Sequence, residues 1–270
     1  MSGASAEAML AVAVRAARAA GSIVLDAGRD LRRLPAFSKE HAEVAAAAEM
    51  EAEDAIVATI RGAYPSHAVL GKESAHIEGA REGAGHKWLV DPIDGIANFM
   101  HGYAGHAVSI ALVHGTELTH AVVFDPVRDE LFEAARASGA TANGATLHVS
   151  ACARIADALV GTVPPPRGDE RVRDYMPALA ALMSHCAGVR MAGSPALTLA
   201  HVAAGRLDAF WMSGLRPWDV AAGALLVKEA GGRIGDLAGG SQYLRTSEVI
   251  AASPGVFGAV REIVATAAER

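Results

Sequence analysis

Two aspartates stand three residues apart at the end of a short apolar run, in the segment W-L-V-D-P-I-D-G-I-A-N-F at residues 88–99. Pro92 fixes its own backbone φ at about −65° and favours an extended conformation at Asp91, so we expect both carboxylates to be held at the C-terminal end of a strand. Mg²⁺ prefers oxygen ligands and keeps several waters. Asp91 and Asp94 therefore indicate a divalent-cation site. The alternative is a polar turn whose aspartates cap the next helix.

Three further acidic residues could take part in such a site. Asp219 follows Pro217-Trp218 and opens a predicted helix, where a role as the N-cap residue would by itself explain an aspartate. Glu49 and Glu53 lie one turn apart on another predicted helix. For this pair, the simple alternative is ordinary solvated charge on a helix surface.

The elements that must position these residues follow from hydrophobic periodicity. In the first half we expect helices at 5–27, 40–61 and 97–101 and a glycine-rich polar loop at 76–86. The expected strands are 68–70, 88–90, 107–113, 118–124, 130–134 and 146–149, of which the three between 107 and 134 form an antiparallel meander. In the second half strands and helices alternate; the strands are 158–163, 189–191, 207–212 and 248–252, and the helices 169–187 (broken or kinked at Pro177), 197–204, 217–230 and 257–268. The sequence thus predicts an α+β half, 1–145, joined tightly to an α/β half, 146–270.

Composition narrows the class of protein. Of the 270 residues 51% are hydrophobic and 20% charged, as expected for a folded chain. The formal net charge of −6 argues against a general nucleic-acid-binding surface. Cys152 and Cys186 form no disulfide framework, and neither a signal peptide nor a run of about 18 apolar residues is evident, so we expect a cytoplasmic protein that does not enter membranes.

The motif D-P-I-D-G-x-x-N-F resembles the inositol monophosphatase family of Mg²⁺-dependent, lithium-sensitive phosphomonoesterases. Two other segments fall in the family's order, G-K-E-S at 71–74 before it and W-D-V-A-A-G at 218–223 after it. Segments beginning at Gly193 and Ala203 are also similar, so the resemblance covers nearly the whole chain. It implies a five-layer α-β-α-β-α sandwich that forms homodimers.

The resemblance also implies roles for individual residues. Metal ligands map onto three carboxylates and the backbone carbonyl of Ile93; the carboxylates are Asp91, Asp94 and Asp219. Phosphate or substrate contacts map onto a second group, namely Gly95, Ile96, Lys72, Gly193, Ser194 and Met212. Catalytic positions map onto Glu49, Glu73 and Ile96. The implied cofactor is Mg²⁺, which activates a water and stabilises the leaving oxygen.

Four of these positions depart from the family pattern. Lys72 replaces a ligand glutamate, Ile96 replaces a water-positioning threonine, Glu49 replaces its partner aspartate, and Met212 replaces a glutamate that reads a substrate hydroxyl. Loss of such positioning costs about 10²–10⁴-fold in rate. We therefore expect fewer metal ions than in typical members, with the Lys72 ammonium partly substituting for a cation.

The expected function is Mg²⁺-dependent hydrolysis of a small phosphate monoester such as inositol 1-phosphate, weak or altered in specificity. The alternative is a catalytically impaired family member that acts as a phosphate-binding, regulatory or interaction protein. The expected partners are a small-molecule phosphate ester and a second copy of the chain, without nucleic acid or membrane.

Overall fold

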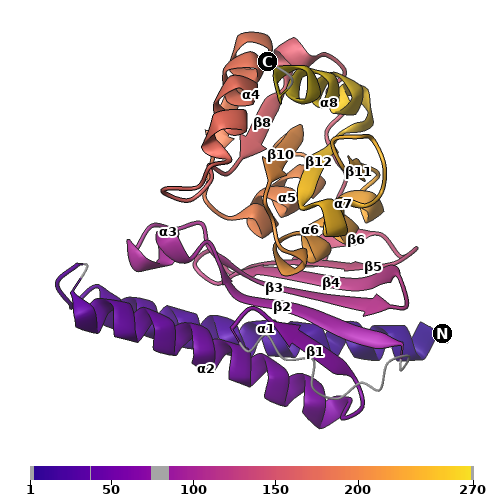
Figure 1. Ribbon diagram of the computed structural model, residues 1–270. Helices are drawn as coiled ribbons and strands as arrows, with labels where there is room; N and C mark the ends of the chain where they lie inside the picture. The colour runs from indigo at the N-terminus through magenta and orange to yellow at the C-terminus, as the bar shows by residue number, and fades with distance from the viewer. Residues whose placement is uncertain (1–2, 37, 74–84, 269–270) are drawn as a thin grey trace.

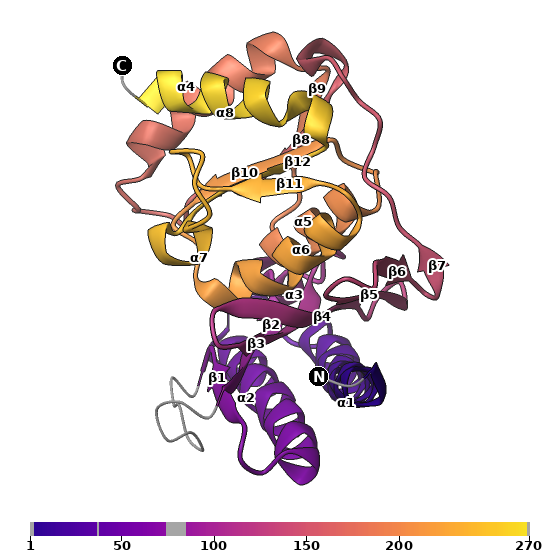
Figure 2. The same cartoon turned by 90° about the vertical axis from the view of Figure 1, so that its right-hand side faces the viewer.

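The computed structural model describes residues 3–36, 38–73 and 85–268. These residues form five layers, in the order helix pair, seven-stranded sheet, helix pair, five-stranded sheet and helix pair (Figure 1). The view turned by 90° shows the same order, with the N-terminal helices and the C-terminal helix on opposite outer faces (Figure 2). The predicted five-layer α-β-α-β-α sandwich is confirmed.

The first outer layer consists of α1 (Gly3–Leu31) and α2 (Lys39–Ala63), each a few residues longer than predicted. They cover one face of the larger sheet, whose strands follow chain order from β1 to β7. β1 and β2 run parallel and all later neighbours are antiparallel, which confirms the predicted meander. The strands are β1 (Ala68–Gly71), β2 (His86–Asp94), β3 (Ala107–His114), β4 (Glu117–Asp125), β5 (Glu130–Ala135), β6 (Ala140–Ala142) and β7 (Ala145–Thr146).

Most of α1 has the length and apolarity of a membrane span, although none was predicted. The stretch Glu7–Leu31 reaches a mean hydropathy of 1.6, with 44% of that window buried inside the protein. Its buried residues, among them Ala16, Ala17 and Ala20, pack in one core with α2 and the larger sheet. Because the core helix of a soluble protein meets the same criteria, this similarity is weak evidence for a membrane segment.

Strand β2 continues through the two aspartates instead of ending before them. Asp91 pairs with Ser109 and Asp94 with Ala107, and the register shifts between the two pairs. Pro92 lies in this irregular stretch, where the missing N–H does not interrupt a regular ladder. The short helix α3 (Ile96–Met100) follows at once. The bulge therefore turns both carboxylates out of the strand's regular alternation.

The middle layer is α5 (Pro195–Ala203) and α6 (Pro217–Glu229), which lie between the two sheets (Figure 1). Eight consecutive residues of α6, from Val220 to Val227, are buried, because both of its sides face a sheet. The smaller sheet has the order β11-β12-β10-β8-β9. Its strands are β8 (Leu159–Thr162), β9 (Gly188–Met191), β10 (Ala209–Ser213), β11 (Arg233–Gly235) and β12 (Glu248–Ala252).

The last layer is α4 (Val172–His185) and α8 (Pro254–Ala268) on the outer face of the smaller sheet. α7 (Tyr243–Thr246) and the 3₁₀ turn η1 (Ile155–Asp157) complete the described elements. α4 continues through Pro177, which lies in its second turn and removes one backbone hydrogen bond. The predicted strand 146–149 is wrong beyond Thr146. Residues 76–84 of the predicted polar loop lie outside the described residues, and the division at 145/146 stays a prediction.

Candidate functional site

Three aspartates from two separate layers meet at the junction of the larger sheet and the middle helices. Asp91 and Asp94 come from the bulge of β2, and Asp219 comes from the first turn of α6. One oxygen of each lies within 4.8 Å of the others. Asp91 and Asp94 are 1% and 2% exposed. Clustered carboxylate oxygens are the donor set that Mg²⁺ prefers, so the residues present fit that ion.

Asp219 was predicted to be the N-cap residue of α6, and this is wrong. It lies three positions after the N-cap. The helix begins at Pro217 with Arg216 as its cap, and the backbone N–H of Arg216 donates to Asp219 Oδ2 at 2.7 Å. This is the reciprocal half of a capping box. One oxygen therefore stabilises the helix start, and the carboxylate still contributes an oxygen to the cluster.

Asp94 is held from the side of α5. The hydroxyl of Ser194 and the backbone N–H of Ala196 (2.9 Å) both donate to Asp94 Oδ2. The Ser194 hydroxyl also accepts from Leu197 N–H and so caps α5. Ser194, predicted to contact substrate, is thus a buried positioning residue for Asp94.

Lys72 points into the cluster rather than outward. Its Nζ lies 2.7 Å from Glu49 Oε1, 3.5 Å from Asp91 Oδ1 and 3.4 Å from the carbonyl oxygen of Ile93. The Lys72 side chain is 25% exposed. Two oxygens that the family resemblance assigns to metal therefore already face an ammonium group.

The reading of Glu49 and Glu53 as ordinary solvated charges is wrong. They are 9% and 3% exposed. Both continue the buried stripe of α2 formed by Ala52, Ile56 and Ile60, and this spacing was the available signal. Glu53 Oε2 accepts the backbone N–H of Glu73 at 2.9 Å, and a side chain at Gly71 would overlap the Glu53 carboxylate. The family resemblance had assigned Glu53 no role.

Glu73, predicted to be catalytic, is next in sequence to the pocket that contains the three aspartates but is not among its lining residues. The residue is exposed. Its backbone N–H donates to Glu53, and its carboxyl group is still near enough to Glu49 and Lys72 for their charges to act on it. Ser74 of the same motif lies outside the described residues.

Electrostatic effects in the cluster oppose one another. Burial, the neighbouring aspartates and Glu49 raise the pKa of Asp91 well above its usual range, although Lys72 acts against this shift. Burial and the Asp219 charge raise the pKa of Asp94 to about 7, against the lowering effect of Ser194. Burial also raises the pKa of Asp219. Burial lowers the pKa of Lys72, but Asp91 and Glu49 outweigh it and leave that pKa above its ordinary value.

A pocket of about 270 Å³ opens over the cluster. Five of the predicted substrate positions line it, and Ser194 does not; they are Lys72, Gly95, Ile96, Gly193 and Met212. Gly95 has φ +91°, and a Cβ there would lie 3.1 Å from the carbonyl oxygen of Gly105, so only glycine fits this turn without strain. Pro166, Leu215 and Arg171 also line the pocket, and the sequence carried no recognised signal for them.

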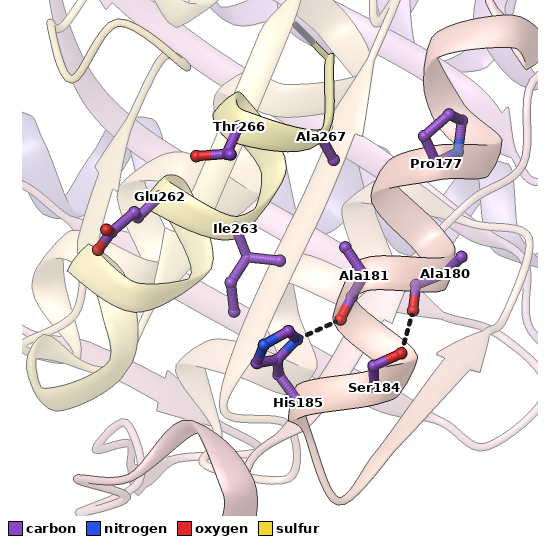
Figure 3. Close-up of a pocket in the computed structure, with 9 residues that line it drawn as sticks. All are labelled: Pro177, Ala180, Ala181, Ser184, His185, Glu262, Ile263, Thr266 and Ala267. Carbon is purple, nitrogen blue, oxygen red and sulfur yellow. Dashed lines mark hydrogen bonds between the residues drawn. The ribbon is translucent and has the colours of Figure 1, made fainter. Parts of the chain in front are cut away.

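A larger hollow, of about 580 Å³, lies between α4 and α8 on the outer face (Figure 3). The His185 ring bonds to the carbonyl oxygen of Ala181 and the Ser184 hydroxyl donates to that of Ala180, so both polar groups are satisfied within α4. Glu262 is the one carboxylate among its lining residues. This hollow therefore lacks the converging charge of the smaller pocket.

Comparison with known proteins gives consistent matches. The model of the inositol monophosphatase family matches residues 5–268. "Nus factor SuhB" of Pseudomonas aeruginosa is 44% identical over 93% of this chain and 94% of its own length. "Inositol-1-monophosphatase" of Rhizobium meliloti is 40% identical over 95% of this chain and 96% of its own. The crystal structure of the extragenic suppressor protein suhB from Bartonella henselae has a TM-score of 0.86 at 35% identity, covering 95% of this chain and 98% of that one.

Metal binding at this cluster is expected to weaken as the pH falls. A cation binds the ionised carboxylates, so it must displace any proton held by Asp94, whose pKa is raised to about 7. One displaced proton with that pKa predicts about tenfold weaker Mg²⁺ binding at pH 6 than at pH 8. Calorimetric titration of Mg²⁺ at the two pH values measures this, and proton release appears as a buffer-dependent heat. Equal affinity at both values would contradict the prediction.

Proposed function

Because the chain belongs to the inositol monophosphatase family, we propose that it is a Mg²⁺-dependent phosphomonoesterase that acts on a small phosphate ester. The observation that carries this proposal is the meeting of Asp91, Asp94 and Asp219 within 4.8 Å beneath a pocket of small-molecule size. Burying like charges together is costly unless a cation joins them. Inositol 1-phosphate is the first substrate to test.

In this proposal each part of the site has one task. Asp91, Asp94, Asp219 and the carbonyl of Ile93 hold Mg²⁺, which when bound polarises the phosphate and lowers the pKa of a bound water. The backbone N–H groups of Gly95 and Ile96, at the turn after Asp94, hold phosphate oxygens. Ser194 keeps Asp94 in place through the hydrogen bond to Oδ2.

Lys72 acts as a built-in cation. Its ammonium contacts Glu49, Asp91 and the Ile93 carbonyl at once, as a metal ion bridging these oxygens would. Together with one Mg²⁺ it neutralises three of the four carboxylate charges contributed by Glu49 and the three aspartates. A second ion at this position would meet the ammonium, and at about 4 Å and an effective dielectric of about 20 each pair of unit charges repels by about 4 kcal/mol. We therefore propose fewer metal ions than in typical members.

The same residues predict slow turnover and an altered substrate. Ile96 lines the pocket but its side chain forms no hydrogen bond, so it cannot orient an attacking water. Glu49 forms an ion pair with Lys72 at 2.7 Å and is therefore less free to orient the attacking water. Met212 presents an apolar surface to the alcohol portion of a substrate.

A second candidate function is that of a phosphate-binding, regulatory or interaction protein. Relatives at 36–44% identity are named "Nus factor SuhB", a name that denotes a factor rather than an enzyme. The Lys72–Glu49 ion pair and Ile96 favour this candidate, because they preserve a charged pocket while removing groups that activate water.

We further propose a cytoplasmic homodimer. The described residues expose seven large apolar side chains, and four of them lie on α4 and β9, namely Val172, Met176, Met183 and Met191. The three on α4 are spaced by four and seven residues and so share one face. A second copy of the chain would remove this stripe from water. The net charge of −6 supports such a partner over nucleic acid.

Hydrolysis of inositol 1-phosphate is expected to require Mg²⁺ and Asp91. Asp91→Asn removes a ligand charge and is expected to lower phosphate release at least 100-fold. Asp26→Asn, a matched change in an exposed ion pair with Arg29, is expected to change it less than twofold. Phosphate release by the purified protein over an Mg²⁺ titration measures this. No release from a panel of phosphate esters, with phosphate still bound, would instead support the regulatory candidate.

Lys72→Glu is expected to add a metal site, because a carboxylate replaces an ammonium next to Asp91 and Glu49. Equilibrium dialysis with phosphate should give one Mg²⁺ per chain for wild type and at least one more for Lys72→Glu. Combining Lys72→Glu with Ile96→Thr and Glu49→Asp should raise turnover at least tenfold. Lys39→Glu, at an exposed surface pair, is the control. Unchanged stoichiometry would contradict the built-in cation.

Met183→Glu is expected to dissociate the dimer. The substitution places a charge in the middle of the apolar stripe on α4, where a second copy would bury it. Light scattering after size exclusion should give a dimer mass for wild type and for Met50→Glu, a matched change at an exposed methionine of α2, and a monomer mass for Met183→Glu. A monomeric wild-type chain would refute the proposal.

A further inference from the structure

Arg171 lines the same pocket as the three aspartates of the cluster. It lies at the end of the segment that joins β8 to α4, directly before Val172. Pro166 of the same segment lines the pocket with it. Among the lining residues Lys72 and Arg171 are the two cations, and Lys72 is already paired with Glu49 at 2.7 Å. Arg171 is thus the pocket's cation that does not belong to the metal cluster.

The guanidinium of Arg171 is held in one orientation. Its Nε donates to both carboxylate oxygens of Asp169, at 2.9 and 3.0 Å, and its Nη2 also donates to Asp169 Oδ2. The backbone N–H of Arg171 donates to the same carboxylate at 2.9 Å. A fork fixed in this way loses little rotational freedom when it binds a ligand. Asp169 therefore acts as a positioning residue.

The third nitrogen of the fork, Nη1, takes no part in this ion pair and lies over Gly214. A Cβ at Gly214 would overlap Nη1, and the residue has φ +82°, so glycine is needed here for space and for conformation. Gly214 also lines the pocket. The backbone after β10 thus leaves room for Nη1, whose two N–H groups both stay outside the ion pair with Asp169.

The space between the two charged ends is apolar. Met212 and Leu215 are 8% and 3% exposed, and both line the pocket together with Pro166. The volume of about 270 Å³ is below the range of about 300–1,000 Å³ typical of drug-sized ligands. A ligand that spans the pocket is therefore short, with a phosphate at the cluster, an uncharged middle, and an end group at Arg171.

We propose that Arg171 determines specificity by binding a second anionic group, so that the site selects short phosphate monoesters whose alcohol portion carries a carboxylate or another phosphate. This inference rests on the proposed function, since it places the ester phosphate at the aspartate cluster. It also accounts for Met212. A substrate that is recognised by its second anionic group at Arg171 does not need a carboxylate at position 212 to bind a hydroxyl group.

Binding of non-hydrolysable phosphonates tests this inference independently of turnover. The probes are propylphosphonate, which has one anionic group, and the ω-carboxylated series from 3-phosphonopropionate to 5-phosphonopentanoate, each titrated calorimetrically into the Mg²⁺-loaded protein. Charge-assisted hydrogen bonds are strong, so wild type is expected to bind the best carboxylated probe at least tenfold more tightly than propylphosphonate. Propane-1,3-diphosphonate distinguishes a preference for phosphate from one for carboxylate.

Arg171→Met is expected to remove this preference while leaving the affinity for propylphosphonate within threefold. Arg171→Lys keeps the charge but not the planar guanidinium, and should retain part of the preference for the carboxylated probe. Asp169→Asn should weaken that preference. Arg173→Met removes an equal charge from an exposed residue two positions away and should keep the full preference.

Three results overturn the inference. If wild type binds propylphosphonate but shows no preference for the second anion, the inference fails and the proposed function stands. The same holds if Arg171→Met weakens both kinds of probe equally, because Arg171 would then have only a structural role. If no phosphonate binds to wild type, the proposed function fails, and this inference fails with it.

Discussion

Repulsion among buried carboxylates is the constraint on which the rest of this structure depends. Asp91, Asp94 and Asp219 bring oxygens within 4.8 Å of one another, and Glu49 adds a fourth carboxylate through Lys72. Removing such charges from water is expensive, and it is tolerable only when cations and hydrogen-bond donors surround them. Three backbone N–H groups, one hydroxyl and one ammonium supply this compensation, and they come from four separate parts of the chain.

The layers of the fold are what bring these parts together. A bulge in β2 points Asp91 and Asp94 to one side, and α6 fits between two sheets with Asp219 in its first turn. The Ser109 hydroxyl donates to the Trp218 carbonyl at 3.2 Å, which ties the larger sheet to the start of α6. Asn98 donates to the carbonyls of Gly105 and Ala192, both at 2.7 Å, and so fixes the turn after Asp94 against the segment before α5.

Much of this arrangement could be predicted from the sequence, because its elements are strongly periodic and its motifs are local. The order of helices and strands follows from periodicity, whereas the five-layer sandwich and the metal role of the three aspartates follow from the family resemblance that the motifs carry. Contacts between distant segments could not be predicted in this way. The pairing of Lys72 with Glu49 depends on how α2 packs against β1, and the position of Arg171 depends on an irregular segment, P-P-P-R-G-D-E-R, which has no period to read. The register of Asp219 was missed because the N-cap and N3 positions both favour an aspartate.

The aspartate cluster also connects the larger sheet to the layer of middle helices. Asp94 belongs to the larger sheet and Asp219 to a helix that packs against both sheets, so a cation shared between them would link β2 to α6. An ion that binds the folded chain more tightly than the unfolded chain stabilises it by about 1.4 kcal/mol for each tenfold excess over its dissociation constant. Such an ion would maintain the fold whether or not the site turns over substrate. A chain of this kind can lose catalysis and still be selected to retain its aspartates.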